Sequence, residues 1–178
     1  AYLGSEEFVK SAGAEDVRNR MKESWLYVFN VNVFTPQGFR DMAGMYSVFD
    51  REGKGRNQTL DFNNLNKILE DSDEVSDRVF LSDGVGFAGV GAYGSGEKTS
   101  EQLAKDGSVI IQYGKEGAID LAEVTSKQYN DRAYVYAIDN PTENVQKVSA
   151  LGGGSSGLDI VGDGYDDVNG VFSFGVKA

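Results

Sequence analysis

Residues 25–34 read Trp-Leu-Tyr-Val-Phe-Asn-Val-Asn-Val-Phe, a stretch dominated by aromatic and β-branched side chains. In an extended chain, successive side chains point to opposite sides. Asn30 and Asn32 therefore share one face, and the other face carries Trp25, Tyr27, Phe29, Val31 and Val33. Because residues of these types favour pleated, packed backbone, the stretch predicts a β-strand.

Two apolar patterns with helical spacing follow this strand. Thr35 and Pro36 suit a helix start, and large side chains then recur at Phe39, Met42, Met45, Tyr46 and Phe49. After a polar stretch, Asp61 can cap a second helix that carries Phe62, Leu65, Ile68 and Leu69. The acidic run 71–77 opposes a helix dipole, so we expect this helix to end near Glu70 and a solvated loop to follow. The pattern predicts a helix–loop–helix.

The second half of the chain holds short apolar runs separated by glycine turns. Candidate strands are 78–81, 108–113, 133–139, 145–151 and 171–177. Together these elements predict an α+β fold: an N-terminal helical part packed on an antiparallel β-sheet, arranged as a sandwich or barrel. We expect one domain over 1–178, with a mixed part at 1–75 and a β-rich part at 76–178. The expected core includes Trp25, Phe29, Phe39, Phe49, Phe62, Leu65, Phe172 and Phe174.

Composition excludes several classes of chemistry. The 178 residues include no histidine and no cysteine, and 28 acidic against 17 basic side chains give a formal charge of -11. These absences remove imidazole bases, thiolate nucleophiles, disulfides and the usual zinc ligands. Any metal must therefore bind oxygen, which favours calcium or magnesium. The acidity argues against nucleic-acid binding, and no apolar run approaches the roughly 20 residues that span a bilayer.

A first candidate metal site lies between the two predicted helices. The stretch Asp50-Arg51-Glu52-Gly53-Lys54-Gly55-Arg56-Asn57-Gln58-Thr59-Leu60-Asp61 resembles the calcium loop of the EF-hand family. Acids stand at loop positions one, three and twelve (Asp50, Glu52, Asp61), and a glycine stands at position six, where the loop turns sharply. Lys54 occupies a position where the family has a ligand. The alternative is a solvated loop between helices.

A second candidate metal site precedes the end of the chain. The stretch Asp159-Ile160-Val161-Gly162-Asp163-Gly164-Tyr165-Asp166-Asp167-Val168-Asn169-Gly170 is similar to the calcium loops of integrin-type propeller repeats. Asp159, Asp163 and Asp167 fall at positions one, five and nine, whereas Val161 departs from the pattern. Closely spaced carboxylates repel one another unless a cation or solvent separates them. The resemblance implies bound calcium, and the alternative is an acidic hairpin.

Two further segments have possible binding chemistry. Residues 91–99 read Gly-Ala-Tyr-Gly-Ser-Gly-Glu-Lys-Thr, close to a phosphate-binding P-loop, but Glu97 separates the last glycine from Lys98. We interpret 84–96 as a flexible surface loop. The tyrosines Tyr113, Tyr129, Tyr134 and Tyr136 form an aromatic set that indicates either a packed sheet face or a binding surface.

Three functions stay open at this point. Composition and glycine turns favour a non-enzymatic structural protein, such as a virion capsid, tail or surface-filament subunit, that forms a homo-oligomer or binds other structural proteins. The acidic loops favour a calcium-dependent extracellular binding or adhesion module. An enzyme that uses only carboxylates is the third. We predict no catalytic residue, no cofactor besides calcium, and a virion, extracellular or cell-surface location; Ala1 fits removal of either an initiator methionine or an export signal.

Overall fold

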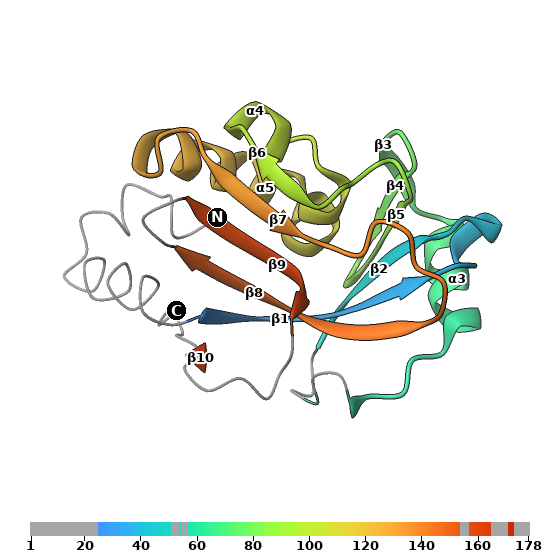
Figure 1. Ribbon diagram of the computed structural model, residues 1–178. Helices are drawn as coiled ribbons and strands as arrows, with labels where there is room; N and C mark the ends of the chain where they lie inside the picture. The colour runs from blue at the N-terminus through green and yellow to red at the C-terminus, as the bar shows by residue number, and fades with distance from the viewer. Residues whose placement is uncertain (1–24, 51–53, 55–56, 154–156, 165–170, 173–178) are drawn as a thin grey trace, which may run out of the picture.

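The computed structural model describes residues 25–50, 54, 57–153, 157–164 and 171–172. In chain order its elements, labelled in Figure 1, are β1 (Trp25–Thr35), η2 (Phe39–Asp41), β2 (Gly44–Phe49), α3 (Phe62–Glu70), β3 (Asp73–Ser76), β4 (Val79–Ser82), β5 (Val85–Gly89), β6 (Gly96–Lys98), α4 (Ser100–Leu103), α5 (Gly107–Gln128), β7 (Ala133–Tyr136), β8 (Val145–Gly153), β9 (Leu158–Gly164) and β10 (Val171–Phe172).

All described strands belong to one sheet. Its order is β3-β4-β5-β2-β1-β8-β9-β7-β6, and β10 pairs with the start of β1. The β7–β9 and β1–β10 pairs are parallel, and the other pairs are antiparallel. The sheet is therefore mixed, not antiparallel as expected. Strands from before and after residue 75 pair directly, since β2 lies beside β5 and β1 beside β8.

Two hydrophobic clusters lie on opposite faces of this sheet. One cluster joins Phe34 of β1 and Met45 of β2 to α5, whereas the neighbouring residues Val33 and Tyr46 join a second cluster with α3. Figure 1 shows α5 along one face and α3 beside the β2, β4 and β5 end. Consecutive strand residues are therefore both buried, because their side chains enter different clusters.

This burial on two faces explains why the first predicted helix is wrong. The residues expected to form a helix over 36–49 form the short η2 and then the strand β2. Met45 and Tyr46 are both fully buried, one toward each face. A strand with two buried faces loses its polar alternation and can match helical spacing by coincidence. The predicted helix–loop–helix is absent from the part of the chain described here.

The second predicted helix is confirmed as α3. Asp61 accepts hydrogen bonds from the backbone N–H groups of Asn63 and Asn64, as an N-cap residue does, and the helix ends at Glu70. The acidic run that follows is partly a strand, because 73–76 form the exposed edge strand β3.

Other predicted strands have mixed outcomes. The stretches 25–34, 78–81, 133–139 and 145–151 largely coincide with β1, β4, β7 and β8. Residues 108–113 instead form the start of α5. Periodicity alone cannot distinguish a short apolar run in a buried helix from one in a buried strand. Residues 84–96 contain the buried strand β5, not only a loop. The run 171–177 is described only at β10.

The expected core is partly confirmed. Phe39 and Leu65 are buried, and Phe62 packs against the α3 cluster while partly buried. Phe49 was expected inside but is 50% exposed, because it is the last residue of β2 and faces a cleft. The side chains of Trp25, Phe29, Phe172 and Phe174 lie outside the described part of the chain.

Gly86 sets the distance between α5 and the sheet. A Cβ atom added there would lie 2.6 Å from Ile111 Cβ and 3.1 Å from Ile111 Cα. We expect Gly86→Ala to lower the free energy of unfolding by about 1–3 kcal/mol, because it pushes the helix backbone away from β5. Chemical denaturation measures this loss. Gly94→Ala is the matched control, since a Cβ there meets only ordinary contacts; equal stability of the two variants would contradict the prediction.

Candidate functional site

A cleft of about 570 Å³ opens on the α5 face of the sheet, beside the last residues of β2. Four separate elements form its walls: β1, β2, the β4–β5 hairpin and α5. The described lining residues are Asn30, Ser47, Phe49, Leu81, Ser82, Asp83, Gly84, Val85, Ile111, Gln112 and Gly114.

Two glycines with positive φ shape the walls of this cleft. Within α5, Gly114 leaves the helical path with φ 76° and ψ 167°. Gly84, with φ 75°, turns the chain between β4 and β5, and its carbonyl accepts the N–H of Phe49 at 2.9 Å. Residues other than glycine rarely adopt such angles. The break in α5 and the anchored turn thus border the cleft on two sides.

Hydrogen bonds across the sheet fix the inner wall. The Asn30 amide Nδ2 donates to Ser47 Oγ at 2.9 Å and to the Gln112 carbonyl at 3.3 Å. Gln112 donates from Nε2 to the Ser108 carbonyl at 2.8 Å, one helical turn earlier. Because the NH₂ groups of both side chains donate to protein acceptors, Asn30 and Gln112 hold defined positions before any ligand arrives.

Beneath this wall lies the fully buried carboxamide of Asn32. Its Nδ2 donates to Gly162 O at 2.8 Å, Ser149 Oγ at 2.9 Å and Gln112 Oε1 at 3.4 Å. Ser149 Oγ also donates to Gln112 Oε1 at 2.6 Å. The Oδ1 atom of Asn32 has no hydrogen-bond donor within the described residues. This network connects β1, β8, β9 and α5 at one point.

The chemistry of the cleft favours binding over bond breaking. Its polar side chains are mostly amides and hydroxyls, which donate and accept hydrogen bonds without charge. Asp83 is the one charged residue among the described lining residues. The half-exposed ring of Phe49 offers an apolar surface beside these groups. A pocket with a few fixed polar groups and an aromatic surface suits a neutral, hydroxyl-rich ligand.

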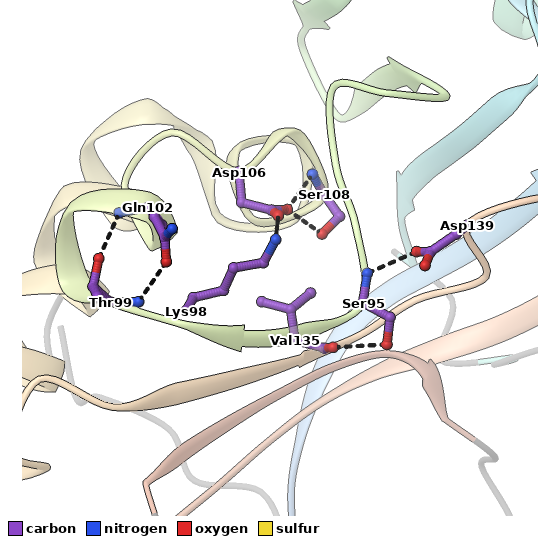
Figure 2. A network of polar contacts seen from close by, with 8 residues as sticks. All are labelled: Ser95, Lys98, Thr99, Gln102, Asp106, Ser108, Val135 and Asp139. Carbon is purple, nitrogen blue, oxygen red and sulfur yellow. Dashed lines mark hydrogen bonds and ion pairs between the residues drawn. The ribbon is translucent and has the colours of Figure 1, made fainter.

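The glycine-rich segment that resembles a P-loop has a structural role. Figure 2 shows Lys98 pointing at Asp106, with Nζ and Oδ2 3.2 Å apart. The Asp106 side chain is 2% exposed, and its Oδ1 accepts the backbone N–H and the hydroxyl of Ser108 at the start of α5. The ammonium that would contact phosphate in a P-loop is therefore paired with a buried carboxylate.

The rest of this segment is held by its own side chains. Thr99 and Gln102 form a capping box at α4, with bonds of 3.3 and 3.0 Å (Figure 2). Ser95 N donates to Asp139 Oδ1 at 2.7 Å, and Ser95 Oγ donates to the Val135 carbonyl at 3.0 Å. The Ser95 contacts contradict the expectation of a flexible surface loop over 84–96 at its last residues, because they attach the backbone to β7 and to Asp139.

The first candidate calcium set is divided among different structural roles. Asp50 is buried and accepts the Lys54 N–H at 3.1 Å, and Asp61 caps α3. Glu52 lies outside the described residues. Strand β2, not a helix, precedes this stretch, so the helix expected from the EF-hand resemblance is wrong on that side. Metal binding by these three residues stays a prediction.

The second candidate calcium set begins within a strand. Asp159 and Asp163 both lie on β9, four residues apart, and Asp167 lies outside the described residues. Burial raises the pKa of both carboxyls, although Lys147 opposes the rise at Asp163. Four extended residues span about 13 Å, so these two side chains alone do not converge on one ion. No group of three potential ligands gathers within the described residues.

Sequence reasoning missed the cleft because its walls come from distant parts of the chain. One signal was available: Asn30 and Asn32 interrupt a strongly apolar strand, and buried amides need fixed partners. The tyrosine set is divided: Tyr113 and Tyr129 pack against the α5 cluster, whereas Tyr134 and Tyr136 are exposed. Among the described helices, none combines the length and the hydropathy that a bilayer crossing needs.

We expect Asn32→Ala to destabilise the protein by about 2–4 kcal/mol, because it leaves Ser149, Gln112 and the Gly162 carbonyl without their shared donor in a buried site. Urea unfolding followed by circular dichroism measures the change. Asn63→Ala removes an exposed carboxamide from α3 and serves as the control. A loss at Asn32 no larger than that at Asn63 would show that the network contributes little.

Comparisons with known proteins identify a fold. No protein-family model matches the chain, and no curated protein matches it. A solved structure from a study of how the C-type lectin fold accommodates massive sequence variation in Nanoarchaeota is similar to it, with a TM-score of 0.53 and 11% identity. The match covers 92% of this chain and 79% of that chain. At this identity the likeness concerns the fold alone.

Proposed function

We propose that this chain is a non-enzymatic, extracellular binding module whose cleft at the end of β2 takes a neutral, hydroxyl-rich ligand such as a carbohydrate. The observation that carries the proposal is the composition of that cleft. Fixed amide and hydroxyl groups lie on its inner wall, and the half-exposed Phe49 ring lies at its edge. Sugars offer hydroxyls to the first kind of group and C–H faces to the second.

The fold likeness supports the same proposal. A C-type lectin fold fits an extracellular binding module, which was the second of the functions that the sequence left open. The virion capsid, tail or filament hypothesis stays a prediction, because neither the described contacts nor the fold likeness favours it. An enzyme based on carboxylates lacks a pair of acidic groups in the cleft, where Asp83 is the one acid among the described lining residues.

An array of neutral oligosaccharides, probed with the full chain, tests the proposal. We expect selective binding that Phe49→Ala weakens about tenfold, since roughly half of an aromatic ring no longer packs on the ligand. Titration calorimetry on the best ligand gives the affinity of each variant. Because Phe49 is already half exposed, its loss should cost little stability.

Ile119→Ala is the matched control, because Ile119 is another exposed apolar residue, at 53%, and does not line the cleft. We expect it to leave the affinity unchanged. Absence of binding to every neutral sugar, or equal effects of the two variants, would overturn the carbohydrate assignment.

The calcium prediction has its own test. If calcium binds, we expect millimolar calcium to raise the melting temperature of the full chain. An ion that binds only the folded state stabilises that state by mass action. Asp167→Asn should abolish this rise if the second acidic stretch holds the ion, and Glu52→Gln should abolish it if the first does. A melting temperature that does not change with calcium or with a chelator would remove the prediction.

A further inference from the structure

A second surface, outside the cleft, carries two exposed tyrosines. Tyr134 and Tyr136 of β7 are 40% and 37% exposed, whereas their neighbours Ala133 and Val135 are buried in the α5 cluster. Alternation along the strand therefore places the two tyrosines on the face turned away from α5. Their ring centroids lie 4.5 Å apart with an interplanar angle of 42°. The rings form a continuous aromatic surface.

A carboxylate on the neighbouring strand lies beside these rings. Asp159 of β9 is in register with Tyr134. Burial raises the pKa of Tyr136, and the negative charge of Asp159 adds to that rise. Burial raises the pKa of Asp159 itself. Among the described residues, no cation and no hydrogen-bond donor is paired with this carboxylate. Desolvating a carboxylate costs free energy that an external cation would recover.

A small pocket joins the rings to the carboxylate. Its volume is about 90 Å³, and Tyr134, Tyr136, Asp159, Glu97 and Arg132 contribute to its lining. Arg132 Nε donates to Glu97 Oε1 at 2.8 Å, so these two charges offset each other. Asp159 is then the uncompensated charge among the described lining residues. The described lining of the pocket therefore carries a net negative charge, and its volume of about 90 Å³ is that of a small site.

We propose that this pocket binds the guanidinium group of an arginine side chain from a partner polypeptide. A guanidinium is planar, stacks on aromatic faces and pairs with a carboxylate through two parallel N–H groups. Tyr134 and Tyr136 supply the stacking surface, and Asp159 supplies the acceptor. The charge of the pocket selects a cationic partner, and its size admits one side-chain head group.

This site is independent of the cleft. It lies on β7 and β9, whereas the cleft lies among β1, β2, the β4–β5 hairpin and α5. If the cleft does not bind sugars, the proposal for the guanidinium site still stands. If the guanidinium site does not bind the peptide, the proposal for the cleft still stands. A chain with both sites would hold a neutral ligand in one place and a protein in another.

Nuclear magnetic resonance titration of the full chain with an acetyl-Gly-Arg-Gly-amide peptide tests the proposal. We expect shifts of the Tyr134, Tyr136 and Asp159 backbone amides, and weaker binding as salt increases. Asp159→Asn should weaken binding about fivefold, and Tyr136→Leu about threefold, as expected for a partly exposed ion pair and a cation–π contact. Tyr136→Phe keeps the ring and should bind as the parent does.

Three controls separate this site from general charge attraction. The same peptide with citrulline is uncharged and should not shift these amides. Glu116→Gln removes an exposed carboxylate from α5, outside the pocket, and should leave binding unchanged. The titrations contain a chelator, so that calcium cannot compete for Asp159. Equal binding of the citrulline peptide, or equal effects of the Asp159 and Glu116 variants, would overturn the proposal.

Discussion

The burial of the Asn32 carboxamide is the constraint on which the rest of the structure depends. An amide without water must have protein partners, and here they come from β8, β9 and α5 at the same time. Apolar packing alone would allow α5 to slide along the sheet. The directional bonds from Asn30, Asn32 and Ser149 to Gln112 fix the position of α5, and the cleft wall at Gln112 follows from that position.

Burial of the sheet on both faces decided how far the fold could be predicted. β7 was predicted because its burial alternates, and β1 was predicted because two asparagines alternate with apolar residues although both of its faces are buried. α3 was predicted with its Asp61 cap. β2 and β5 were missed because side chains on both faces are buried, which removes the period of two. The start of α5 was read as a strand for the same reason: residues 107–112 are all buried.

The cleft could not be predicted from local sequence patterns, because its walls come from elements that are distant in the chain. Phe49 was expected in the core, but the end of β2 places it at the edge of the cleft. Because residues 108–113 were expected to form a strand, the break of α5 at Gly114, which borders the cleft, was not predicted. Asp50 and Asp61 were predicted as calcium ligands, and the structure gives both a structural contact: Asp50 accepts the Lys54 N–H, and Asp61 caps α3. Composition limits any metal ligand to oxygen, and it cannot assign each carboxylate to a structural or a binding role.

The two ends of the described sheet limit what can add to it. β3 has four residues with Asp73 and Glu74 exposed, and β6 has three residues including the exposed Glu97. A long, flat, apolar edge would act as a template for strands of other chains, whereas short charged edges discourage such growth. The short, charged edge strands β3 and β6 therefore disfavour fibre formation by strand pairing between folded copies. Any association between copies would then use side-chain surfaces, and the symmetry of that contact would decide whether it closes into a ring or grows.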